Sequence, residues 1–203
     1  MKKGFTLLEI LSVLVILMIV LGITGIIIKP HLIFQRTRDL KRISDLNALE
    51  IAIKTYISAT NTPILGPDDE GYGETNQKIF ISVPFDKEDK RNLNVSGFSI
   101  YQVSSTNLLK IDGNGWLPIN FSVLVYPPIH SLPIDPLNSY NLKYFYSYVF
   151  KRASSTFEIN ANLEYERFKR GGSEDKTSFD GGDNPDIFEV GTEKTLIPNN
   201  LYQ

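Results

Sequence analysis

The feature that most constrains this chain is a long apolar run near its N-terminus. From Phe5 to Ile28 there are 24 residues, and Glu9 is the only one with an ionisable side chain. As a helix rising 1.5 Å per residue, the run would be about 36 Å long, against about 30 Å for the hydrocarbon core of a bilayer. It is therefore predicted to cross a membrane. Because Lys2 and Lys3 precede it, the positive-inside rule keeps the N-terminus in the cytoplasm and exports everything after Lys29.

Three kinds of N-terminal segment compete to explain this run. A secretory signal peptide has an apolar region of about 7–15 residues that ends at a small-x-small cleavage site. This run is longer, and no Ala-x-Ala follows it. An ordinary signal anchor fits the length but leaves Glu9 unexplained, because ionisable residues in a membrane span usually have a partner.

The third interpretation rests on residues 2–9, Lys-Lys-Gly-Phe-Thr-Leu-Leu-Glu. This stretch resembles the class III signal of type IV pilins and pseudopilins, and the resemblance covers the first thirty residues. It implies that a membrane-embedded prepilin peptidase cuts between Gly4 and Phe5, and that the new N-terminal Phe5 is N-methylated. It also implies that Glu9 pairs with the Phe5 amine of a neighbouring subunit, which fixes the register as subunits stack.

The resemblance further implies partners and a location. The subunit would polymerise with copies of itself and with minor pilins or pseudopilins, driven by a cytoplasmic ATPase through a membrane assembly platform. Before assembly it would lie among the lipids of the cytoplasmic membrane as a single-pass protein with an exported head. Afterwards it would belong to a periplasmic or cell-surface filament. Because minor subunits at a filament tip often lack the glutamate, Glu9 favours a place in the shaft.

Beyond Pro30 the pattern changes to that of an amphipathic helix. Apolar residues recur three and four positions apart with charged residues between them, until Asn61-Thr62-Pro63 ends the helix. We therefore expect an α+β protein in which a long N-terminal spine helix, transmembrane and then amphipathic, packs on a small antiparallel β-sheet head, as in pilins. The expected parts are a leader over 1–4, a transmembrane or filament-core helix over 5–29, an amphipathic helix over 30–61 and an exported head over 62–203.

The head is predicted to begin with a long loop containing short elements over 63–97 and to continue with short strands. Phe98–Val103 and Leu108–Ile111 flank a turn signal and are expected to pair as a hairpin. Apolar residues alternate in Tyr144–Phe150 and in Thr156–Leu163, which is typical of antiparallel strands with one buried face. The aromatic residues of the first of these strands are expected to pack against the spine helix.

Composition excludes several functions. The chain has no cysteine, so it can form neither disulfides nor cysteine-based metal sites. It has only two histidines, His31 and His130, which lie about a hundred residues apart in the sequence. Its net charge of −2 gives no electrostatic reason to expect nucleic-acid binding. Since no nucleophile–base motif appears, we expect no enzyme; a membrane-tethered binding module that never polymerises is the main alternative of another class.

The segment Gly171–Gly191 is rich in carboxylates and glycines. Calcium is bound by six to eight oxygens, often in flexible loops, and Asp180, Asp183 and Asp186 offer such oxygens close together. A solvated, turn-forming loop explains the same composition.

Leu132-Pro133-Ile134-Asp135-Pro136 resembles the Leu-Pro-x-Asp-Pro stretch of major pseudopilins of type II secretion, whose C-terminal loop binds calcium. The resemblance implies a major-pseudopilin-like shaft subunit of a type II secretion system. A type IV pilus major pilin for adhesion, motility or DNA uptake remains the alternative.

Overall fold

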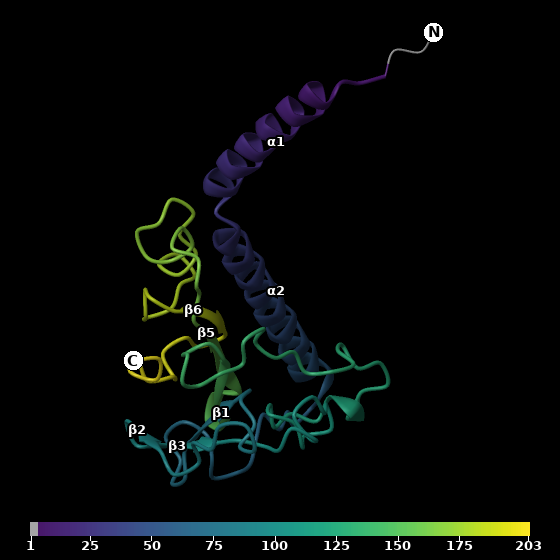
Figure 1. Cartoon of the computed structure of the whole chain (residues 1–203). Coiled ribbons are helices and arrows are strands. Elements are labelled where there is room, and N and C mark those ends of the chain that lie inside the picture. Colours follow the sequence, from purple (N-terminus) through teal and green to yellow (C-terminus); the bar gives the residue numbers. More distant parts are fainter. Residues whose placement is uncertain (1–3) are drawn as a thin grey trace. The chain divides into compact units, whose positions relative to one another are not determined.

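The computed structural model describes residues 4–203, apart from the side chains of residues 23–28. Residues 1–3 of the predicted leader over 1–4 therefore lie outside the described residues, as do the side chains of residues 23–28 in the predicted span over 5–29. Two helices come first, α1 over Leu7–Ile28 and α2 over Pro30–Ala59 (Figure 1). Within the described part of the chain, no helix combines the length and the apolar character needed to cross a membrane.

The two helices are separated at Lys29. This residue has left-handed backbone geometry, with a φ of 43°, and Pro30 is the first residue of α2. A proline lacks the backbone N–H for the helix ladder and pushes the preceding residue out of helical geometry, so the sequence itself places the break. Compact packing divides the chain at Thr37, and the unit from Arg38 onwards contains the head together with most of α2.

The head is built on a six-stranded sheet with the strand order β2-β3-β1-β4-β5-β6. Strands β1 and β3 pair in parallel, and every other pair in this sheet is antiparallel. The predicted α+β class, with helix α2 packed on a mostly antiparallel sheet, is confirmed. The strands span Lys78–Ile81 (β1), Asn94–Val95 (β2), Phe98–Tyr101 (β3), Tyr146–Lys151 (β4), Thr156–Ala161 (β5) and Phe188–Gly191 (β6).

The local predictions for the head were right in one place and wrong in others. Strands β4 and β5 pair antiparallel as expected. The predicted hairpin of Phe98–Val103 with Leu108–Ile111 is wrong, because β3 pairs with β1 and β2 and the second segment forms turns. Strands β1 and β2 lie in the predicted loop over 63–97, and β6 lies in the predicted acidic loop. Each of these missed strands is four residues or shorter, too short for alternation to mark it.

The expectation of one buried face for β4 and β5 is also wrong, because both faces of these strands are buried. Tyr146, Tyr148 and Phe150 lie on the face covered by α2, where the Tyr146 hydroxyl donates to the Asp45 carboxylate at 2.9 Å. The opposite face packs against the C-terminal segment, whose Leu196, Ile197 and Leu201 join an apolar cluster with Val149 and Phe145. The chain end thus completes the core.

Candidate functional site

The predicted cleavage site lies in non-helical chain just before α1. Gly4 and Phe5 are not part of the helix, and Phe5 is 83% exposed. A Cβ built on Gly4 would meet no other atom within 4 Å, so the space around this residue is open. The Gly4–Phe5 peptide bond is therefore accessible to a peptidase in the isolated subunit.

Glu9 has a local partner that the sequence analysis missed. Thr6 caps the N-terminus of α1, and its backbone N–H and side-chain hydroxyl donate to Glu9 Oε2 at 2.8 and 2.9 Å. The Glu9 backbone N–H donates in return to Thr6 Oγ1 at 3.3 Å. This reciprocal arrangement is a capping box, and its Thr-x-x-Glu signal stands in the sequence. Glu9 therefore has a partner within its own helix, besides the neighbour's Phe5 amine that the resemblance implies.

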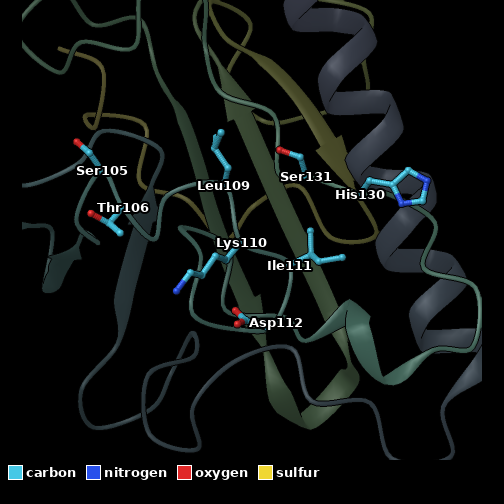
Figure 2. Close-up of a pocket in the computed structure, with 8 residues that line it drawn as sticks. All are labelled: Ser105, Thr106, Leu109, Lys110, Ile111, Asp112, His130 and Ser131. Carbon is cyan, nitrogen blue, oxygen red and sulfur yellow. The ribbon is translucent and has the colours of Figure 1, made fainter.

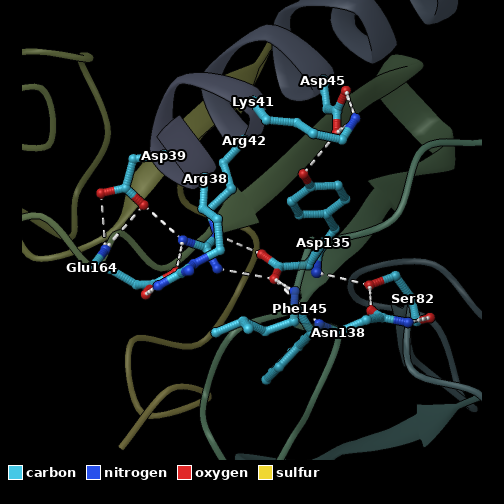
Figure 3. A network of polar contacts seen from close by, with 12 residues as sticks. Arg38, Asp39, Lys41, Arg42, Asp45, Ser82, Asp135, Asn138, Phe145 and Glu164 are labelled. Carbon is cyan, nitrogen blue, oxygen red and sulfur yellow. Dashed lines mark hydrogen bonds and ion pairs between the residues drawn. The ribbon is translucent and has the colours of Figure 1, made fainter. Parts of the chain in front are cut away.

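A buried ionic cluster joins α2 to the head (Figure 3). At its centre is Arg42, whose side chain is fully buried. Its guanidinium donates to both carboxylate oxygens of Asp135, at 2.5 and 3.0 Å, and to Glu164 Oε1 at 2.5 Å. It also contacts Asp39 Oδ1 at 2.7 Å, one helical turn earlier. Charged residues of an amphipathic helix are expected to face solvent, whereas Asp39 and Arg42 both lie on the buried face of α2.

The cluster has one more carboxylate than guanidinium groups, and backbone donors make up the difference. Arg38 adds a second guanidinium through its ion pair with Glu164. The Asp39 carboxylate accepts from the backbone N–H groups of Glu164 and Tyr165, at 3.0 and 2.7 Å. Burial raises the pKa of Asp39 even so. Burial also works to raise the pKa of Glu164, but hydrogen bonds from Arg38 and Arg42 outweigh it and leave that pKa lowered.

The cluster gives a structural role to the Leu132–Pro136 stretch. Besides holding Arg42, Asp135 accepts from the backbone N–H groups of Leu137 and Asn138, at 2.8 and 3.2 Å. Leu132 is buried, and the Pro133 carbonyl accepts from the Trp116 indole at 2.9 Å. This stretch therefore connects the head to the helix through one carboxylate.

In the acidic C-terminal segment, the structure brings together a different set of carboxylates from the predicted one. Oxygens of Glu158, Asp183 and Glu189 all lie within 4.8 Å of one another. Of the predicted trio, only Asp183 belongs to this group. Asp180 accepts from the backbone N–H groups of Gly182 and Glu189, at 2.8 and 2.7 Å. Asp186 is exposed and lies outside the group.

The two glutamates of this group are fully buried, since Glu158 and Glu189 are each 0% exposed. Asn160 lies between them, and its Nδ2 group donates hydrogen bonds to Glu158 at 2.8 Å and to Glu189 at 3.3 Å. The buried Oδ1 of Asn160 has no hydrogen-bond partner among the described residues. Burial and the neighbouring Glu158 charge raise the pKa of Glu189 to about 9.

Carboxylate and amide oxygens are the ligands that calcium prefers. The three clustered carboxylates and the Asn160 Oδ1, which has no hydrogen-bond partner among the described residues, therefore fit this cation. Calcium bound there would compensate the two buried charges. The sequence signal was incomplete because Glu158 lies on β5, outside the glycine-rich segment.

A shallow hollow in the head also contains polar side chains, among them His130, Asp112 and Ser131 (Figure 2). The His130 ring points away from the other labelled side chains. The hollow is lined by Ser105, Thr106, Leu109, Lys110, Ile111, Asp112, His130 and Ser131. Its polar side chains therefore do not converge as a nucleophile and its base would.

In a comparison with protein-family models, the prokaryotic N-terminal methylation motif matches residues 1–25. The chain carries the class III signal of type IV pilins and pseudopilins. Searches of the curated proteins and of the solved structures gave no match. The methylation motif supports a type IV pilin-like or pseudopilin subunit. It implies processing by prepilin peptidase, membrane insertion and assembly into an exported filament.

Proposed function

We propose that this chain is a major-pseudopilin-like shaft subunit of a type II secretion system. The observation that carries the proposal is the methylation motif over residues 1–25 on a chain whose second helix packs on a mostly antiparallel sheet. In this account the protein is a structural subunit and not an enzyme. Residues 5–29 cross the cytoplasmic membrane before assembly, with the N-terminus in the cytoplasm, and then enter the filament core.

The choice of a secretion pseudopilin rests on the Leu132–Pro136 stretch. In this stretch, the Asp135 carboxylate accepts two hydrogen bonds from the guanidinium of the buried Arg42. It also accepts hydrogen bonds from the backbone N–H groups of Leu137 and Asn138 in its own loop. That role in fixing the head to the spine gives a physical reason for the resemblance to major pseudopilins. A major pilin of a type IV pilus, used for adhesion, motility or DNA uptake, would need the same connection and is the second candidate.

The proposal assigns roles to the N-terminal residues. Prepilin peptidase cuts between Gly4 and Phe5, and the new Phe5 amine is methylated. Glu9 caps its own helix in the isolated subunit, through Thr6. During assembly by the platform and its ATPase, Glu9 pairs with the Phe5 amine of a neighbour, because opposite charges attract far more strongly in lipid than in water. Minor pseudopilins complete the filament.

Two variants separate capping from pairing. Glu9→Ala removes the carboxylate and abolishes both interactions, whereas Thr6→Val removes only the hydroxyl of the capping box. We expect negative-stain microscopy of cells to show filaments with Thr6→Val and at least tenfold fewer with Glu9→Ala. An equal loss of filaments in the two variants would mean that Glu9 acts only by capping its own helix. Normal filaments with Glu9→Ala would exclude the pairing role, and a wild-type chain that never polymerises would favour the tethered binding module.

We also propose that calcium binds between Glu158, Asp183 and Glu189. Two observations support this site: the buried carboxylates of Glu158 and Glu189 lie close together, and the nearby Asn160 Oδ1 has no hydrogen-bond partner among the described residues. A divalent cation would offset the repulsion between the two carboxylates. Millimolar calcium should raise the melting temperature of the full chain in detergent relative to chelator, and Glu189→Gln should abolish the shift. Asp186→Asn serves as the matched control in the same segment. No shift in the wild type would refute the cation site.

A further inference from the structure

Helix α2 has an uncharged stripe on the side away from its buried face. The stripe runs over more than four turns, and at 100° per residue its members fall within an arc of about 80°. Leu40 and Ile51 in this stripe are 51% and 65% exposed. The outward stripe consists of Leu40, Ser44, Asn47, Ile51, Thr55 and Ser58, all of them exposed.

Charged pairs flank the outward stripe without entering it. Lys41 pairs with Asp45, and Lys54 pairs with Glu50, each one helical turn apart. A helix that packs one face on its own domain usually presents charged residues on the opposite face. Here the opposite face carries no charged residue, and two of its six residues, Leu40 and Ile51, are large and apolar. A partner can therefore cover this face without burying an ion. A shallow hollow beside Ile51 is lined by Thr55, Ser58 and Ala59 and also by Lys54, which is paired with Glu50.

A second exposed apolar surface lies at residues 123–129, Val-Leu-Val-Tyr-Pro-Pro-Ile, which we call the apolar tip. Val125 and Tyr126 in it are 86% and 88% exposed. Consecutive exposed apolar residues are unfavourable unless they have a function, and contiguous apolar patches mark interaction sites.

The base of the apolar tip is fixed. Phe121, just before the tip, is fully buried and packs edge-on against Tyr56 of α2, with ring centroids 5.8 Å apart. After the tip, the Leu132 backbone N–H donates to the Leu109 carbonyl at 3.0 Å. Two adjacent prolines restrict the backbone between these anchors. A restrained loop loses little conformational entropy when it docks.

We propose that the apolar tip of one subunit packs on the outward stripe of α2 in the next copy of this chain. The two surfaces differ and lie on one molecule, so their contact is head-to-tail, and contacts of this kind generate open helical assemblies. Neither surface carries a charge, so the contact buries no unpaired ion. This inference rests on the proposed filament and specifies which surfaces of the head meet within it.

Cross-linking tests the contact directly, because the chain has no cysteine of its own. Ser58→Cys places a thiol on the outward stripe, and Val125→Cys places one on the apolar tip. Filaments of the double variant, treated with a bismaleimide, should give a ladder of covalent multimers. Each single variant should give dimers at most. A control double variant, Ser58→Cys with the exposed Ser173→Cys of the acidic segment, should give no ladder.

Microscopy of the same samples separates the inference from the proposed function. Wild-type filaments with a ladder from the Ser58–Val125 pair support the contact. Three results would overturn the contact between the apolar tip and the outward stripe without affecting the proposed filament. These are filaments without that ladder, an equal ladder from the control pair, and cross-links only to another protein. A wild-type chain without filaments would overturn both. As a second measurement, Tyr126→Asp should lower filament yield at least tenfold, whereas Phe179→Asp, at another 84% exposed residue, should not.

Discussion

The N-terminal segment and the acidic C-terminal segment differ in how their interactions are encoded. Around Gly4–Glu9 every interacting residue lies within one helical turn, and Thr6 and Glu9 bond to each other. In the C-terminal segment the clustered carboxylates come from β5, β6 and the loop between them, so Glu158 meets Glu189 across 31 residues of sequence. A contiguous motif can be recognised from sequence alone, whereas a site assembled by strand pairing depends on the register of the sheet.

We therefore expect substitutions in the head to lower its free energy of unfolding, and substitutions in the N-terminal segment to affect filament assembly. The strongest test is Arg42→Ala, which leaves Asp135 buried without its guanidinium partner. Breaking a buried ion pair costs about 3–5 kcal/mol. Urea denaturation of the full chain in detergent should show a loss of that size. Arg91→Ala, at an exposed pair with Asp89, is the control and should change little; equal effects of the two variants would contradict the ionic connection.

A second test addresses the close packing in the acidic segment. A Cβ built on Gly182 would overlap Glu189 Oε2, so a larger residue at this position would have to displace that buried carboxylate. Gly182→Ala should lower the free energy of unfolding by about 1–3 kcal/mol, as overpacking does. It should also abolish any calcium-dependent rise in melting temperature. If Gly182→Ala keeps both the wild-type free energy of unfolding and a calcium-dependent rise in melting temperature, the loop must take another path.

A third test uses acid. The folded-state pKa of Glu164 is lowered, so its contribution to stability is present above the usual pKa of about 4.3 and is lost as pH falls through the lowered value. The wild-type melting temperature should therefore fall on acidification below about pH 4.3. In Glu164→Gln that fall should be smaller, since this variant cannot lose the charge. Parallel acid curves for the two proteins would exclude Glu164 as a contributor.

The smallest expected effect on the head comes from Thr6→Val. Loss of an N-cap costs about 1 kcal/mol of local helix stability, and the change lies in α1, outside the unit that begins at Arg38. Hydrogen exchange should show faster exchange of the first amides of α1, with the strands of the head unchanged. Faster exchange in β4 and β5 would contradict this expectation, because it would mean that loss of the cap in α1 destabilises the head.

The same contrast explains how much of the molecule the sequence predicts. The methylation motif and the pairing of β4 with β5 follow from short-range patterns. The break at Lys29 was not part of the predicted continuous spine helix, although Pro30 explains it. The burial of Asp39 and Arg42 does not, because charged residues at such positions are expected to face solvent until Asp135 and Glu164 are known to meet them. Asp183 was placed in the carboxylate group, but Glu158 and Glu189 were missed because their meeting depends on the register of β5 with β6.

The proposed function requires that this chain is cut between Gly4 and Phe5 and then polymerises. Mass spectrometry of subunits released from sheared filaments tests it most directly. We expect an N-terminal peptide that begins at Phe5 and carries one added methyl group on its amine. Subunits that retain Met1 within filaments, or cells that make the processed chain without any filament, would contradict it.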